Sequence, residues 1–175
     1  MKKLIFFITA LLMSAIINAQ TNPIDDIFEK YSEREGFTSV YISGRMLGML
    51  VGMETKEGNP DNILRRIKSI RILTADDSVV IPKVNLYAEL SRKLDLSVYE
   101  ELMVIKEGPE VTKFMILEKD NLISELLVIS GGDDGNALIS IRGDLNLKEL
   151  SQLSKTIGIE ELEQLEKVEE KKPGK

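Results

Sequence analysis

The sequence of 175 residues contains no histidine and no cysteine. Without cysteine there is no disulfide, and no thiol to carry the lipid that anchors bacterial lipoproteins. Without histidine the chain lacks the usual proton carrier near neutral pH, as well as the His- and Cys-based sites for zinc and for activated nucleophiles. Any catalysis would depend on carboxylates, lysine, tyrosine or a metal held by oxygen ligands. We therefore expect no cofactor.

Basic and aromatic residues are scarce as well. The chain has 23 Lys and Arg against 29 Asp and Glu, and aromatic residues make up 5% of it. Nucleic-acid binding draws most of its affinity from cations beside phosphates, and single strands also stack on aromatic rings. Neither a basic cluster nor a phosphate-binding glycine loop is present. The chain is therefore not expected to bind nucleic acid.

Residues 1–19 have the layout of a secretory signal peptide. Lys2 and Lys3 precede an apolar run from Leu4 to Ile17, and the small residue Ala19 stands at the cleavage position. The run is shorter than the roughly 20 residues that span a bilayer. We expect export to the periplasm or medium and no stable membrane anchor after cleavage, with an uncleaved anchor as the alternative. Loss of two lysines would take the net charge from −6 to −8, which favours solubility.

Residues 20–158 are predicted to form a single α+β domain, with helices packed on one face of a largely antiparallel sheet. Helices are predicted from Asn22 to Gly36, over 45–53, after the cap Asn59 through Ile67, over 80–94, and after the cap Asn146. Strands are predicted over 37–42, 69–74, 102–106, 111–118, 122–130 and 137–142.

Short turn-like connectors predict that the last four strands form an antiparallel meander, joined in the sheet by the two earlier strands. The helix after Asn146 is predicted to place Leu147, Leu150, Leu153 and Ile157 in the core. Residues 159–175 are rich in Glu and Lys, and they are predicted to form an acidic, partly disordered tail that adds little to stability.

Two kinds of acidic cluster bear on metal binding and catalysis. Residues 131–136 read Gly-Gly-Asp-Asp-Gly-Asn, which are ingredients of a calcium loop. The EF-hand spacing is absent, however, and a hairpin turn between two strands is favoured. The doublets 76–77 and 100–101 are favoured as solvated surface, because adjacent residues of a strand point to opposite faces. We therefore predict no catalytic and no metal-binding residue.

The helix predicted over 45–53 is rich in methionine. Met46, Met49 and Met53 could form an adaptable surface for a partner, because methionine side chains repack easily. Alternatively, Met46, Leu47, Leu50 and Met53 share one stripe that would pack into the core. The packing interpretation is favoured, and the three methionines remain the candidate interaction surface.

Several short stretches are typical of one bacterial family. They are Phe28-x-x-Tyr31, Gly36 to Ser43, Tyr99 to Met103, Ser124 to Leu127 and Ile139 to Leu145. In these stretches the chain resembles the exported family catalogued as domain of unknown function 4252, over roughly residues 24–156. The resemblance implies a place in the envelope of Gram-negative bacteria, and it implies no activity and no site residue. Some relatives look like lipoproteins, and this chain departs from them in lacking cysteine.

Three functions remain as hypotheses. The leading one is a non-enzymatic periplasmic interaction module in envelope homeostasis or signalling, with an envelope protein as its partner. The alternative is a binder of a lipid or other apolar ligand, because the strands at 111–130 have apolar residues on both faces and must be covered on both. The third is a carboxylate-based enzyme, which would need two acidic side chains converging in a cleft.

Overall fold

The computed structural model describes residues 22–54, 63–75, 84–132 and 135–146, and of residues 51–54 only the backbone. In chain order the elements are α2 (Pro23–Tyr31), β1 (Phe37–Ser43), α3 (Gly44–Glu54), η1 (Ile63–Arg65), β2 (Ile67–Ala75), α4 (Leu86–Lys93), η2 (Leu96–Val98), β3 (Glu100–Glu107), β4 (Glu110–Lys119), β5 (Leu122–Gly131) and β6 (Ala137–Leu145). The predicted signal peptide, the last predicted helix and the predicted tail lie outside the described residues.

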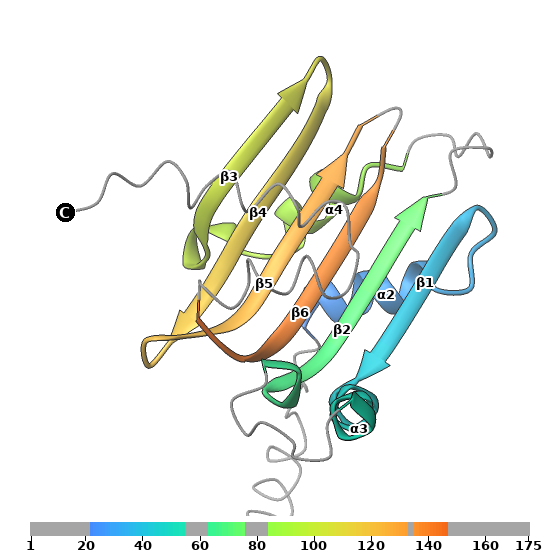
Figure 1. The fold of residues 1–175 in the computed structure, drawn as a ribbon. Helices are drawn as coiled ribbons and strands as arrows, with labels where there is room; N and C mark the ends of the chain where they lie inside the picture. The colour runs from blue at the N-terminus through green and yellow to red at the C-terminus, as the bar shows by residue number, and fades with distance from the viewer. Residues whose placement is uncertain (1–21, 55–62, 76–83, 133–134, 147–175) are drawn as a thin grey trace, which may run out of the picture.

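The strands form one sheet of six strands in the order β1-β2-β6-β5-β4-β3, and every neighbouring pair is antiparallel. Figure 1 shows this sheet with α2 and α4 behind it and α3 below the end of β1. Strands β3 to β6 are the predicted meander, and β2 joins it by pairing with β6. The predicted α+β class, with helices on one side of an antiparallel sheet, is therefore confirmed.

The meander is built on tight turns. Asp120 and Asn121, which join β4 to β5, have φ values of 54° and 63°. Both angles lie in the left-handed region, and consecutive left-handed residues are typical of the two-residue hairpin turn. Gly108, which joins β3 to β4, has a φ of 59°. The predicted connectors at these two places are thus the observed turns.

Helices α2 and α4 cover one face of the sheet. Asn22 caps α2 through its Oδ1, which accepts the backbone N–H of Ile24 over 2.9 Å. The apolar stripe of this helix is buried together with Leu86 and Leu90 of α4 and side chains of β2, β4, β5 and β6. The two helices are also joined by Glu89, which accepts hydrogen bonds from Lys30, Lys93 and the hydroxyl of Tyr31. This face holds the groove between α2 and β1 that is described below.

The opposite face of the sheet carries a second apolar cluster. Its strand residues include Ile70, Phe114, Leu126 and Ile139, all buried. At one end of the sheet, α3 adds Leu47 and η1 adds Leu64 to this cluster. Both faces of the central strands are therefore buried, as their sequence predicts.

Three element predictions need correction. Ile67 does not end a helix but opens β2, where it pairs with Gly143 of β6, so a long-range strand pairing overrides the local helix signal. Helix α4 begins at Leu86 because Asn85 caps it, accepting the N–H of Ala88 over 2.7 Å, and Val84 is not helical. Helix α2 ends at Tyr31, ahead of Gly36.

Candidate functional site

The Met-rich helix α3 is mostly exposed rather than packed. Leu47 is buried, whereas Met46 is 47% and Met49 is 54% exposed, and Leu50 is also exposed. The expectation of one buried stripe through Met46, Leu47 and Leu50 is therefore wrong. Met53 lies in α3, but its side chain is outside the described part of the structure.

A close backbone contact explains this exposure. A Cβ atom at Gly44 would collide with the main-chain oxygen of Ile67, so only glycine allows the start of α3 to lie against the start of β2. Ser43 adds a cap, because its Oγ accepts the N–H of Met46 over 3.3 Å. Held in this position, α3 contacts β1, β2 and η1 and turns its methionines outward.

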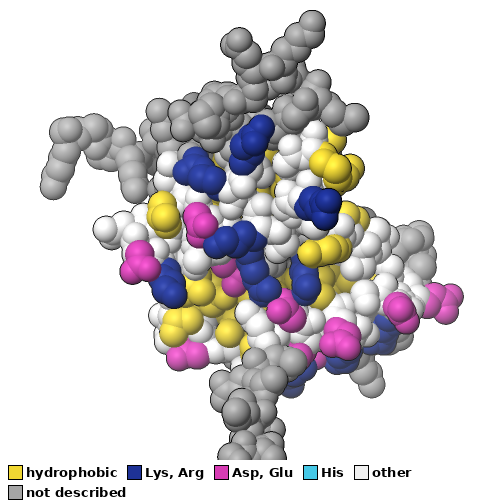
Figure 2. Space-filling model, turned by 90° about the horizontal axis from the view of Figure 1, so that it is seen from below, with side chains coloured by type: hydrophobic (Ala, Val, Ile, Leu, Met, Phe, Trp, Pro, Cys, Tyr) yellow, Lys and Arg dark blue, Asp and Glu magenta, His cyan; other side chains and the backbone are white. Residues whose placement is uncertain are grey.

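Strand β1 carries two more exposed apolar side chains, which, as neighbours on a strand, point to opposite faces of the sheet. Its residues Val40 and Tyr41 are 40% and 63% exposed. Among the described side chains, seven large hydrophobic residues are exposed, and five of them fall between positions 40 and 50. We call these five the β1–α3 surface: Val40, Tyr41, Met46, Met49 and Leu50. Viewed from the end of the sheet near α3, Figure 2 shows hydrophobic side chains interspersed with Lys and Arg.

A groove of about 350 Å³ lies between β1 and α2, behind this surface. It is lined by Asp25, Phe28, Glu29 and Ser32 of α2, by Ser39, Val40 and Tyr41 of β1, and by Arg71 of β2. Most of these side chains are charged or carry a hydroxyl, whereas a pocket for an acyl chain needs a mainly apolar lining.

Arg71 is fixed at the base of this groove. Its Nη1 donates to Oδ1 of Asp25 over 2.9 Å. Its guanidinium carbon lies 5.7 Å from the ring centre of Phe28 and 5.4 Å from that of Tyr41. These distances allow cation–π attraction to both rings. Arg71 thus ties α2 to the outer two strands of the sheet.

A polar network continues from Asp25 into the interior. Arg142 of β6 donates through Nη1 to Oδ2 of Asp25 over 3.1 Å, and through Nε to Oε1 of Glu125 over 2.9 Å. Glu125, which is 3% exposed, also accepts the hydroxyls of Ser140 and Tyr99, the latter over 2.8 Å. With Arg71, two guanidinium groups balance two carboxylates, of which Glu125 is buried, whereas Asp25, Arg71 and Arg142 are each partly exposed.

The pKa values of two groups in this network, Tyr99 and Arg142, are shifted from their ordinary values. Burial, and then the negative charge of Glu125, raise the pKa of the Tyr99 hydroxyl well above its ordinary value. Burial lowers the pKa of Arg142, but Glu125 and Asp25 outweigh burial and leave the pKa raised. Near neutral pH, Tyr99 therefore stays a neutral donor and Arg142 a cation. Asp25 and Glu125 meet at Arg142, but only Asp25 lines the groove.

The acidic doublet of β3 takes no part in this network. Glu100 and Glu101 are exposed at the far edge of the sheet, and Glu101 pairs with Lys113 over 2.6 Å. Asp76, Asp77, Asp133 and Asp134 lie outside the described residues. Among the residues that the structure describes, no three acidic side chains are grouped so as to hold a metal ion.

The buried network was missed in the sequence, although a signal for it exists. Arg71, Glu125 and Arg142 each stand among apolar residues in the middle of a strand, although β2 also carries Lys68 and β6 also carries Asp144 near a strand end. A charged residue in such a run must either reach solvent or find a partner of opposite charge. The pairing itself depends on strand order and could not be predicted locally.

Comparison with known proteins identifies the family. The family model described as domain of unknown function (DUF4252) matches residues 31–153 of the chain. The chain belongs to this family. The match begins at the last residue of α2 and includes all six strands, so the family region holds Arg71, Glu125 and Arg142 but not Asp25.

Two further comparisons add no relative. No curated protein and no solved structure matches the chain significantly. Within the described ranges, none of the helices has the length and apolar character needed to cross a membrane.

Proposed function

We propose that this chain is a non-enzymatic interaction module of the bacterial envelope, which binds a protein partner through the β1–α3 surface. The observation that carries the proposal is that five of the seven exposed large hydrophobic side chains among the described residues lie on two consecutive elements, three of them on α3 and one on each face of β1. Exposed apolar side chains that lie together favour a protein contact, whereas scattered ones are ordinary surface. Methionine is suited to this role because it adapts to different partner shapes.

The buried network supports the same function indirectly. Asp25, Arg71 and Arg142 fix α2 on the sheet beside β1, and Gly44 fixes α3 below it. A rigid support lowers the conformational entropy lost when a partner binds. The groups in this network hold α2 and the sheet together, and nothing in their chemistry calls for a substrate.

The proposal is tested by capture from an envelope extract with the full chain as bait. Met49→Glu is expected to abolish capture of any reproducible partner, because it places a charge at the centre of the apolar surface. Val98→Glu is the matched control, since Val98 of η2 is 58% and Met49 54% exposed. Equal loss in both variants, or no effect of either, would overturn the proposed surface.

Enzymatic activity is tested in parallel. The wild-type chain is expected to show no turnover in a broad hydrolase screen. Turnover that disappears in a Glu125→Gln or Asp25→Asn variant that still folds would favour the carboxylate enzyme and would count against an interaction module.

A further inference from the structure

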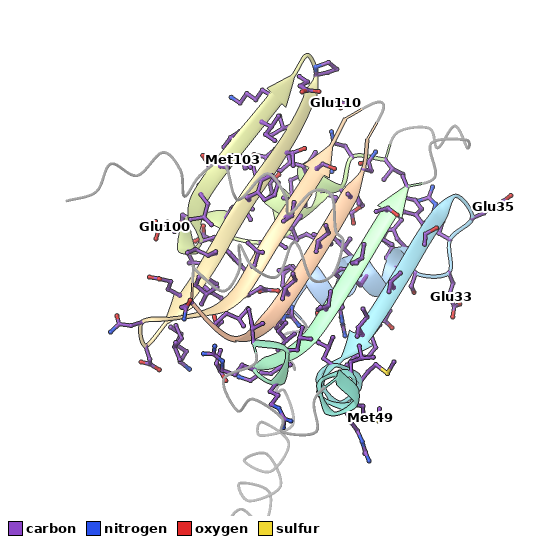
Figure 3. The ribbon with its side chains drawn as sticks, viewed as in Figure 1. Glu33, Glu35, Met49, Glu100, Met103 and Glu110 are labelled. Atoms are coloured by element: carbon purple, nitrogen blue, oxygen red, sulfur yellow. The ribbon has the colours of Figure 1, made fainter. Side chains whose placement is uncertain are left out.

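The two edge strands of the sheet are protected very differently. β3, at one edge, carries Glu100, Glu101, Lys106 and Glu107, and its register with β4 shifts between Glu101 and Met103. Charged residues and irregular register at an edge both hinder pairing with another strand. Figure 3 shows Glu100 on β3 pointing away from the sheet at this edge.

β1, at the other edge, has neither charged residues nor a shift in register. Its sequence, Phe-Thr-Ser-Val-Tyr-Ile-Ser, contains no charge and no proline. Its register with β2 runs without a shift from Phe37 opposite Ala75 to Ser43 opposite Ser69. A regular, uncharged edge strand offers its outward N–H and C=O groups to a further strand.

We propose that this further strand is β1 of a second copy of the chain, paired antiparallel about a two-fold axis through Val40. The inference rests on the proposed function, and it names a second copy as the partner of the interaction module. The two six-stranded sheets would then form one continuous sheet. A two-fold interface uses the same patch on both copies, so the patch must complement itself.

The sequence of β1 meets this condition. With Val40 opposite its own copy, Thr38 lies opposite Ile42 of the second copy, and Ser39 lies opposite Tyr41 of the second copy. The first two pairs join β-branched residues, which are favourable cross-strand neighbours. No like charges oppose each other along the strand, because β1 carries none.

Charges beyond the strand ends are complementary as well. Before β1 the chain bears two acidic residues and one basic residue, Glu33, Arg34 and Glu35, and α3 after it begins with Gly44 and Arg45, all exposed apart from the glycine. Figure 3 shows the two glutamates near one end of β1 and Met49 near the other. An antiparallel pair brings opposite ends together, so Glu35 approaches Arg45 of the second copy. The same two-fold rotation brings Met46 and Met49 of α3 toward the loop that precedes β1 in the second copy.

The dimer is expected to be weak. A single strand pair with a helix contact at each end buries less than the roughly 1,600 Å² of a standard interface. Both copies also carry net negative charge, −6 each for the full chain. We expect dissociation in the micromolar range, about 1–100 μM, corresponding to about 5–8 kcal/mol.

Sedimentation velocity of the full chain at increasing concentration tests the inference. The wild type is expected to shift from monomer to dimer, and Val40→Lys is expected to remain monomeric. Leu122→Lys is the matched control and should dimerise like the wild type, because Leu122 and Val40 are both 40% exposed. A wild type that stays monomeric at the highest concentration, or a Val40→Lys dimer as stable as the wild type, would overturn the inference.

A charge exchange tests the two-fold geometry without touching β1. Glu35→Arg and Arg45→Glu should each weaken the dimer, and the double variant should restore it. Failure of the double variant to restore it would refute this pairing.

If the chain is monomeric but Met49→Glu still abolishes partner capture, the second-copy inference fails and the interaction module stands. If Met49→Glu also has no effect, both fail.

Discussion

Glu125 of β5 and Arg142 of β6 face each other across neighbouring strands, with Nε of Arg142 donating to Oε1 of Glu125 over 2.9 Å. The carboxylate of Glu125 is almost fully buried, and Arg142 reaches from it to Asp25 on α2. One guanidinium group therefore links the interior of the sheet to the helix that covers it. The consequences of this link can be measured.

Glu125→Gln should be strongly destabilising, because it leaves the charge of Arg142 without its buried counterion. Breaking a buried ion pair in this way costs about 3–5 kcal/mol. The control is Glu101→Gln, which removes the exposed partner of Lys113 and should cost about 0–1 kcal/mol. Urea unfolding measures both, and similar losses in the two variants would show that the network contributes little.

Tyr99→Phe should remove a hydrogen bond to Glu125 but no ionisable group that titrates in the folded protein. We expect a loss of about 1–3 kcal/mol, since the hydrogen bond is made to a charged group. Because the pKa of Tyr99 is strongly raised, the tyrosinate absorbance of the variant should coincide with that of the wild type until alkaline unfolding begins. An extra ionisation in the folded wild type would contradict the burial of this hydroxyl.

Glu89 should make the chain sensitive to acid. Burial raises the pKa of Glu89, but hydrogen bonds from Lys30, Lys93 and Tyr31 outweigh burial and lower the pKa to about 2. In the unfolded chain the pKa is near the ordinary value of 4.5. The carboxylate therefore stabilises the fold above pH 4.5, by on the order of 2–3 kcal/mol, and this stability is lost as the pH falls from 4.5 towards 2.

The acid effect is checked by comparing the unfolding free energies of the wild type and Glu89→Gln across this range. The difference should be largest near neutral pH and should shrink towards pH 2, where the wild-type carboxylate is itself half protonated. Glu118→Gln alters an exposed carboxylate of β4 and serves as the control. A Glu89→Gln difference that does not change with pH would place its cause in packing and not in charge.

Gly44→Ala and Gly48→Ala should have opposite effects, although both lie in α3. A Cβ at Gly44 would collide with the backbone of Ile67, and such overpacking typically costs about 1–3 kcal/mol. A Cβ at Gly48 meets nothing within 4 Å, so alanine there should be neutral or stabilise the helix by up to about 1 kcal/mol. Thermal unfolding distinguishes the two, and a tolerated Gly44→Ala would mean that α3 can move away from β2.

The sequence predicted what is determined by local pattern. Alternation and turn residues located all six strands, and Asn22 and Ser43 marked two helix starts that the structure confirms. The wrong prediction at Ile67 has a physical cause. The helix through Ile67 is predicted from the local cap residue Asn59, whereas the strand partner of Ile67, Gly143, is distant in the chain. The long-range pairing of β2 with β6 determines that Ile67 lies in a strand, and a short stretch of neighbouring residues carries no information about this pairing.

In the candidate site, too, the sequence predicts what depends on local pattern but not what depends on long-range contacts. The composition of α3 suggested a surface at Met46 and Met49, but which face of α3 turns outward is decided by the contact of Gly44 with Ile67. Likewise, the edge position of β1 follows from strand order, so Val40 and Tyr41 could not be recognised as exposed. Arg71 and Arg142 could be identified as unusual residues in apolar strands, but their common partner Asp25 could not.

The central position of β6 has a consequence for the order of folding. β6 is the last of the described strands, yet it lies between β2 and β5, and Ile70 of β2 pairs with the distant Ile141. Contacts so distant in sequence form slowly, because a long loop must close before they can contribute. While the chain is being synthesised, β1 and β2 can therefore pair before β6 is present, and the other side of β2 then lacks its final neighbour. Until β6 pairs with it, that side of β2 is an unpaired edge of the kind that makes folding intermediates prone to aggregate.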